Sequence, residues 1–168
     1  MKVCIIGISG AGKTTLAKKL AIELNVPTYA YDDIYWNKRS GEYIKNTPEI
    51  INSLVSAIKS ERDWIVEGAY DRRMLPFFED CSLIIRLKIP YRICVLRIIK
   101  RYLLAKITKT RHKETILNTI ELLRFAKRFD NQLNVFFDST PAVMHKIVEV
   151  NNTKQCSLEI KKHLNETS

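Results

Sequence analysis

The sequence lacks any apolar run approaching the roughly 20 residues that a helix needs to span a bilayer, and a strand-like segment already begins at residue 3. The first absence argues against a membrane-spanning helix, and the second leaves no room for a signal peptide. We therefore expect a cytoplasmic protein with no membrane partner. With 168 residues, of which 46% are apolar, the chain is long enough for a substantial core and is expected to form one domain, 1–168.

Metal-binding and disulfide patterns are also missing. The four cysteines are far apart, no Cys-x-x-Cys pair occurs, and the three histidines form no cluster. These spacings give no zinc site, and disulfides are not expected in a cytoplasmic chain. Cys4 and Cys94 lie in apolar runs and are expected to behave as small buried hydrophobic residues.

Acidic residues are scarce between Arg86 and Arg128, where 13 Lys or Arg stand against Glu114 and Glu121 and give a charge of +11. The rest of the chain has 15 Lys or Arg and 16 acids, a charge of −1, which accounts for the total of +10. Such a local excess favours an anionic partner, either nucleotide phosphates or nucleic acid. A solvated helix face explains the same charge equally well.

Glycine is scarce too, but three of the five glycines fall within Gly7–Thr14. This stretch has the spacing G-x-x-x-x-G-K-[ST], which is typical of a phosphate-binding loop, or P-loop. Its glycines let the backbone amides turn inward, and no Cβ blocks the approach of a polyphosphate. Lys13 is expected to reach the β/γ-phosphates and Thr14 to ligate Mg²⁺. The residues expected to bind the phosphates are Gly7, Ser9, Gly10, Ala11, Gly12, Lys13, Thr14 and Thr15.

The flanking sequence supports this interpretation. Val3–Ile6 is a short apolar run that predicts a buried strand, and apolar residues recur at helical spacing from Leu16 to Leu24. The alternative, a glycine-rich turn with a chance lysine, does not account for strand, loop and helix in this order.

The remaining chain alternates between strand-like and helix-like segments, which predicts an α/β domain. Further strands are expected at residues 28–31, 64–68, 82–87 and 146–150, and helices at 48–61, 91–106, 114–137 (with a break near 130–131) and 154–164. Two helices are expected to bury apolar stripes formed by Ile50, Ile51, Leu54, Val55 and Ile58, and by Ile93, Leu96, Ile99 and Leu103.

Carboxylates follow two of the predicted strands. Asp32 and Asp33 come directly after the second strand, and Glu67 ends the third. Ligands of parallel α/β sheets bind beyond the carboxyl ends of the strands. There Asp32 would take a proton from a substrate hydroxyl, and Glu67 would hold water on Mg²⁺. The alternative for Asp32 and Asp33 is that they cap the next turn.

Other candidates are weaker. Gly68 permits a close backbone approach, and Tyr70 and Arg72 follow it near the same sheet edge, where an arginine would hold a phosphate or carboxylate. Tyr35 and Trp36 line either a substrate pocket or the core.

Arg97 and Arg101 are four residues apart on one predicted helix, so an anion between them would offset their repulsion. Arg111 lies in a short basic segment, 107–113, that is expected to act as a flap with this arginine as a phosphate clamp.

Four blocks give the chain a family resemblance from residue 2 to about residue 130. They are Ile5–Ala17, Asp32–Trp36, Trp64–Tyr70 and Pro90–Arg101. Together they resemble the adenylate-kinase-like P-loop proteins called topology modulation proteins. The chain departs from the family pattern at Glu67, where the family has Asp, and in a shorter lid segment.

The resemblance implies a three-layer P-loop NTPase fold with a parallel five-stranded sheet flanked by helices, adenylate-kinase-like with a short lid at about 97–128. It also implies ATP binding and phosphoryl transfer. The hypothesis is an ATP- and Mg²⁺-dependent kinase with Lys13, Asp32, Arg97 and Arg101 as its catalytic residues. Its acceptor is a small molecule, and the first choice is a nucleotide or nucleoside. The alternative is a nucleotide-dependent regulatory protein that binds nucleic acid through residues 86–128.

Overall fold

The computed structural model describes residues 1–37, 43–108 and 116–152. Its centre is a five-stranded sheet in the order β2-β5-β1-β6-β7, in which every neighbouring pair is parallel. This confirms the predicted α/β fold with a parallel five-stranded sheet. The strands are β1 (Lys2–Gly7), β2 (Thr28–Ala30), β5 (Trp64–Gly68), β6 (Leu83–Leu87) and β7 (Ile147–Val150).

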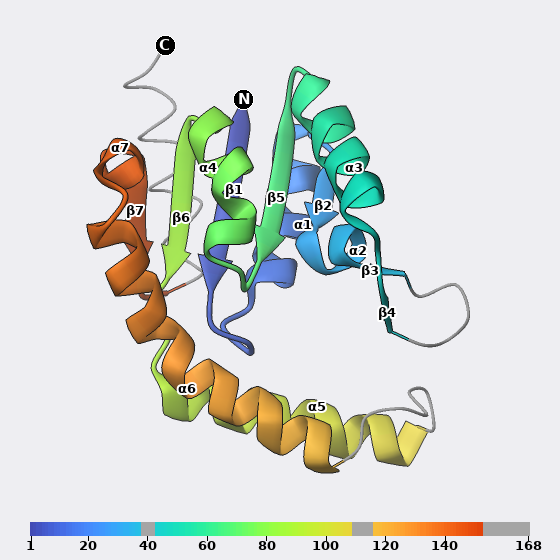
Figure 1. Cartoon of the computed structure of the whole chain (residues 1–168). Helices are drawn as coiled ribbons and strands as arrows, with labels where there is room; N and C mark the ends of the chain where they lie inside the picture. The colour runs from blue at the N-terminus through green and yellow to red at the C-terminus, as the bar shows by residue number, and fades with distance from the viewer. Residues whose placement is uncertain (38–42, 109–115, 153–168) are drawn as a thin grey trace.

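Helices flank the sheet, with α1 and α4 on opposite faces (Figure 1). The helices are α1 (Lys13–Leu24), α2 (Tyr31–Tyr35), α3 (Pro48–Ser60), the 3-10 turn η1 (Arg72–Met74), α4 (Leu75–Asp80), α5 (Tyr91–Thr108), α6 (Ile116–Asp138) and α7 (Pro141–Met144). A small hairpin pairs β3 (Trp36–Asn37) with β4 (Ile44–Lys45). None of the described helices is long and apolar enough to cross a bilayer.

The parallel register brings the carboxyl ends of the strands to one edge of the sheet. Gly7 of β1 pairs with Leu87 of β6, which in turn pairs with Val150 of β7. On the other side Glu67 of β5 is level with Ala30 of β2. The loops that leave this edge are therefore neighbours, although they are far apart in sequence. Beyond the edge, α5 and α6 run side by side (Figure 1), and the Tyr91 hydroxyl donates to the Leu123 carbonyl at 3.2 Å.

The core fills both sides of the sheet with large side chains. Its fully buried members include Trp64, Phe77, Phe78 and Phe129. Cys4 and Cys94 are buried as expected, and Cys156 lies outside the described residues.

Several element boundaries differ from expectation. Tyr31 begins α2 instead of ending β2, so Asp32 and Asp33 lie in the first turn of a helix. Neither acid is the N-cap, which is Ala30. The predicted break near residues 130–131 is wrong, because α6 continues to Asp138. The predicted helix 154–164 and most of the predicted flap lie outside the described residues.

The two predicted apolar stripes are also partly wrong. In α3, Val55 and Ile58 are buried but Ile50 and Leu54 are exposed. In α5, all four residues of the predicted stripe are exposed, and the buried residues are Cys94, Ile98 and Ala105. Because α5 has apolar residues on more than one side, its spacing alone does not select the face that packs inward.

Arg86 is a charged side chain inside the sheet. It lies in β6, and its side chain is only 5% exposed. Its guanidinium donates to Asp130 Oδ1 at 2.8 Å and to Glu149 Oε1 at 3.3 Å, while its Nε has no partner among the described residues. This buried cation ties α6 and β7 to β6. Lys88, which follows the last residue of β6, also pairs with Glu149 at 3.0 Å.

We expect Arg86→Ala to lower the free energy of unfolding by about 2–4 kcal/mol, because it removes buried packing and two charge-assisted hydrogen bonds. Lys88→Ala is the matched control and should cost at most about 1 kcal/mol, since its ion pair is exposed. Urea denaturation of both variants measures the difference. Equal losses would show that the Arg86 pairs do not hold α6 and β7 to the sheet.

Candidate functional site

The glycine loop between β1 and α1 is built on close backbone contacts. Gly10 and Gly12 have φ angles of +83° and +99°, which L-residues with side chains rarely adopt. A Cβ on Gly10 would lie 2.7 Å from the Cys94 carbonyl oxygen, and one on Gly7 would lie 2.8 Å from the Leu87 carbonyl oxygen. Glycine is therefore needed for both the turn and the fit of the loop against α5 and β6.

Lys13 places a positive charge at this loop. Its side chain is buried, and its Nζ donates to the Ile8 carbonyl at 3.1 Å. Burial lowers the pKa of Lys13, while the negative charges of Glu67 and Asp32 oppose that shift. The positive charge of Arg101 acts in the same direction as burial, which places this arginine within electrostatic reach of Lys13. A buried ammonium in a glycine loop at a helix N-terminus suits a polyphosphate.

Thr14 and Glu67 form an oxygen pair next to Lys13. The Thr14 hydroxyl donates to Glu67 Oε1 at 2.6 Å, and Glu67 is buried at the end of β5. Burial raises the pKa of Glu67, although the Thr14 hydrogen bond and the Lys13 charge both oppose the shift.

This oxygen pair fits Mg²⁺ shared with a nucleotide. Hydroxyl and carboxylate oxygens are the ligands that Mg²⁺ prefers. Among the described residues no three His, Cys, Asp or Glu side chains form a complete metal cage. Mg²⁺ commonly takes one or two protein ligands and completes its shell with water and phosphate oxygens. The residues at hand therefore fit a Mg²⁺–nucleotide complex better than a stand-alone metal site.

Asp32 and Asp33 face the same region from α2. Their charges raise the pKa of Glu67, so the three carboxylates lie within electrostatic reach of one another. The Tyr70 hydroxyl donates to Asp32 Oδ1 at 2.6 Å. Burial, together with this hydrogen bond, raises the pKa of Tyr70. Tyr70 therefore fixes one oxygen of Asp32, and because Asp32 is exposed its carboxylate is accessible to solvent.

Aromatic rings pack around Tyr70, the hydrogen-bond partner of Asp32. The ring of Tyr70 lies 4.8 Å from that of Tyr31 and 5.7 Å from that of Tyr35. Gly68 makes this packing possible, because a Cβ there would lie 3.0 Å from the Tyr31 Cβ and 2.8 Å from the Met74 sulfur. Tyr35 is buried, in keeping with the core interpretation, whereas Trp36 is half-buried.

Two cations lie over the Tyr35 ring. Arg73 Cζ is 4.4 Å and Lys45 Nζ is 5.3 Å from its centroid. Neither cation belongs to the P-loop motif, and no spacing in the sequence marks Lys45, which the β3–β4 hairpin brings to the tyrosine. These residues add positive charge on the side of the site that is lined by Asp32 and Tyr70.

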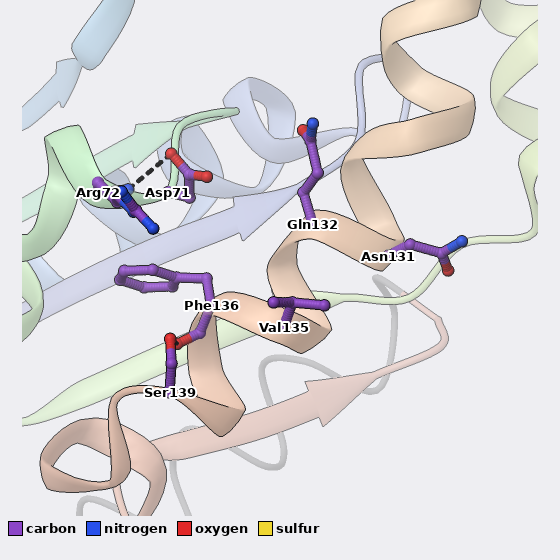
Figure 2. Close-up of a pocket in the computed structure, with 7 residues that line it drawn as sticks. All are labelled: Asp71, Arg72, Asn131, Gln132, Val135, Phe136 and Ser139. Atoms are coloured by element: carbon purple, nitrogen blue, oxygen red, sulfur yellow. Dashed lines mark hydrogen bonds between the residues drawn. The ribbon is translucent and has the colours of Figure 1, made fainter.

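Two of the predicted arginines, Arg97 and Arg72, take different positions. Arg97 donates to the carbonyls of Gly10 and Ala11, both at 3.2 Å, so it connects α5 to the glycine loop. Arg72 lines a separate hollow of about 350 Å³ between η1 and α6 (Figure 2). Arg111 lies outside the described residues.

A second hollow, of about 510 Å³, adjoins the glycine loop on its other side. Ile8 of the loop, Pro90 before α5 and Asn151 after β7 contribute to its wall. Since it is next to the predicted phosphate-binding loop, it is a candidate pocket for the base of a nucleotide. Thr15 is exposed in the first turn of α1.

The raised pKa of Glu67 predicts a pH-dependent stability. The folded chain holds the Glu67 proton more tightly than the unfolded chain, so this residue's contribution falls as pH rises above its ordinary pKa of 4.5. We therefore expect Glu67→Gln to become more stable relative to the parent chain between pH 4 and pH 7. Denaturant titrations at both values, without metal or nucleotide, measure the change. A difference that does not vary with pH would contradict the prediction.

No family model and no curated protein sequence matches the chain. Solved structures do resemble it. Shikimate kinase from Bacteroides thetaiotaomicron matches with a TM-score of 0.60 at 18% identity, over 99% of this chain and 98% of that one. Shikimate kinase from Acinetobacter baumannii in complex with shikimate gives 0.59 at 17%, over 99% and 94%. A gluconokinase from Sinorhizobium meliloti gives 0.54 at 17%, over 99% and 92%. At these identities the likeness concerns architecture, and the chain has the P-loop α/β fold of these small-molecule kinases.

Proposed function

We propose that the chain is an ATP- and Mg²⁺-dependent kinase that phosphorylates a hydroxyl group of a small acceptor. The observation that carries the proposal is the meeting of three groups at one sheet edge. They are the glycine loop with its buried Lys13, the Thr14–Glu67 oxygen pair, and the Asp32–Tyr70 pair. The fold shared with kinases and the motif resemblance to topology modulation proteins support the same activity.

The nucleotide side of the site uses the loop. The loop amides and Lys13 would bind the β/γ-phosphates, and Thr14 with Glu67 would hold Mg²⁺ and its water. The bound nucleotide supplies the phosphoryl group. Arg101, close enough to influence Lys13, would neutralise charge on that group. Arg97 would act on the nucleotide only indirectly, because it holds the loop through hydrogen bonds to two loop carbonyls.

The acceptor side uses the first turn of α2 and the loop after β5. Asp32 would take the proton of the acceptor hydroxyl, with the Tyr70 hydrogen bond keeping its carboxylate oriented. Arg73 and Lys45 would favour an acceptor that also carries a carboxylate or a phosphate. Nucleotides fit this description, as do hydroxylated carboxylates. We also propose that residues 1–168 form a single domain in which residues 97–128 act as the lid.

The alternative of nucleic-acid binding through residues 86–128 receives less support. Arg86 and Lys88 at one end of this region are paired with Asp130 and Glu149. Their charges therefore serve the fold. No observation in the described residues favours this function over the kinase.

Lys13→Ala should weaken binding of the Mg²⁺–ATP complex by at least about 100-fold, because it removes the buried cation at the loop. Lys18→Ala, on the exposed side of α1, is the matched control and should bind normally. Isothermal titration calorimetry measures both affinities. Unchanged binding by Lys13→Ala would rule out this loop as the nucleotide site.

Asp32→Asn should leave ATP affinity nearly unchanged and reduce kcat by about 10² to 10⁴-fold, the usual contribution of a general base. Tyr70→Phe should cause a smaller loss of kcat, because the Asp32 carboxylate loses the hydrogen bond that orients it. Asp33→Asn tests the neighbouring acid. Full turnover by Asp32→Asn would show that another group is the base.

The acceptor is identified by a transfer screen. Labelled ATP with Mg²⁺ is incubated with nucleosides, nucleotides and hydroxylated carboxylates, including shikimate and gluconate, and the products are separated. Transfer to one class, lost in Lys13→Ala, would establish the kinase. ATP binding without transfer to any class would leave a nucleotide-binding protein and overturn the proposal.

A further inference from the structure

Helix α5 is apolar on two opposite sides. Its inner side packs on the glycine loop, where Cys94 is buried and comes close to Gly10. Its outer face carries six exposed aliphatic side chains, with exposed fractions between 39% and 77%. We define this α5 outer face as Ile93, Leu96, Ile99, Leu103, Leu104 and Ile107.

The six side chains form a continuous surface. At 100° per residue they occupy an arc of roughly 140°, and the buried residues Cys94, Ile98 and Ala105 lie on the opposite side. Single exposed leucines are common on protein surfaces, but six together along one helix are typical of an interaction surface. Helices α5 and α6 lie beyond the sheet, at the end of the molecule opposite the N-terminus (Figure 1).

Charge identifies the kind of partner. Helix α5 contains five Lys or Arg and no acid. Arg97 donates to the carbonyls of the glycine loop, and the charge of Arg101 acts on Lys13. Arg92, Lys100 and Lys106 are exposed as well, and Arg92 and Lys100 fall within the arc of the outer face. The surface therefore combines aliphatic side chains with cations.

Three partners would meet this surface differently. In a symmetric dimer through α5, two cationic helices would face each other without a single acid between them, which is unfavourable. Nucleic acid would pair with the cations but would leave the leucines and isoleucines against phosphates. An anionic lipid surface satisfies both, since aliphatic side chains enter the acyl boundary while Lys and Arg bind the headgroups.

We propose that the α5 outer face is a peripheral docking surface for membranes that contain anionic lipids. The helix lies in the plane of the interface, and no segment crosses the bilayer. Leu96, Leu103 and Ile107 enter deepest, and Lys100 extends back to the headgroups. Docking uses the side of α5 opposite the one that contacts the glycine loop. Because the inner side of α5 contacts the glycine loop, it places the nucleotide site close to the lipid surface.

Flotation with vesicles tests the proposal on the whole chain. We expect binding to phosphatidylcholine vesicles containing about one third phosphatidylglycerol and little binding to pure phosphatidylcholine. The double variant Leu96→Ser/Leu103→Ser should reduce the partition coefficient by at least about tenfold, and Lys100→Gln should reduce it several-fold. Ile22→Ser is the matched control on α1, where Ile22 is 83% exposed, and should bind like the parent chain.

A second measurement detects membrane contact directly and does not rely on variants that lose binding. Leu96→Trp should shift its emission to the blue when anionic vesicles are added, whereas Ile22→Trp should not. Thermal melts confirm that each variant is folded. The proposal would be overturned by an absence of binding to anionic vesicles or by binding that the double variant retains. It would also be overturned by a dimer in sedimentation that the double variant abolishes, which would assign the face to a second copy. Competition by duplex DNA with no tryptophan shift would also overturn it, in favour of nucleic acid.

Discussion

The close seating of the glycine loop against its neighbours is the contact on which the rest of the site depends. The loop touches β6 through Gly7 and α5 through Gly10, at distances that leave no room for a Cβ. Within the loop seated in this way, Lys13 is buried and its Nζ donates to the Ile8 carbonyl. The same contact orients α5, because the side of that helix that meets the loop must be its inner side. The phosphate site and the position of α5 thus follow from one backbone packing.

The site also contains two buried groups of opposite charge, each of which offsets part of the cost of burying the other. Lys13 and Glu67 are both removed from water, which lowers the pKa of the amine and raises that of the acid, and each opposes the shift of the other. Neither is neutralised by a direct ion pair between them in the described contacts, since Lys13 donates to a backbone carbonyl and Glu67 accepts from Thr14. A polyphosphate would pair with Lys13, and a divalent cation would pair with Glu67. Ligand binding therefore explains these two buried charges better than a contribution to folding stability does.

Arg86 shows the contrasting case of a buried cation that serves the fold. Its two carboxylate partners come from α6 and β7, and their side chains remain about half exposed. The charge count of the basic region could not separate this arginine from Arg97, which braces the loop. The two arginines differ in burial and in hydrogen-bond partners. Both properties depend on elements that are distant in sequence.

The sequence by itself determined the α/β alternation, the place of each candidate carboxylate after or at the end of a strand, and the candidate phosphate-binding loop, because these follow from local periodicity and from the spacing of glycines around Lys13. It also placed Glu67 and Asp32 at the correct sheet edge, since parallel strands share their carboxyl ends. Tertiary structure alone decided that Tyr70 orients Asp32, that Lys45 joins Tyr35, and which side of α5 faces inward. Those outcomes depend on which surfaces meet when the sheet closes, and a helix that is apolar on two sides carries no local signal of that choice.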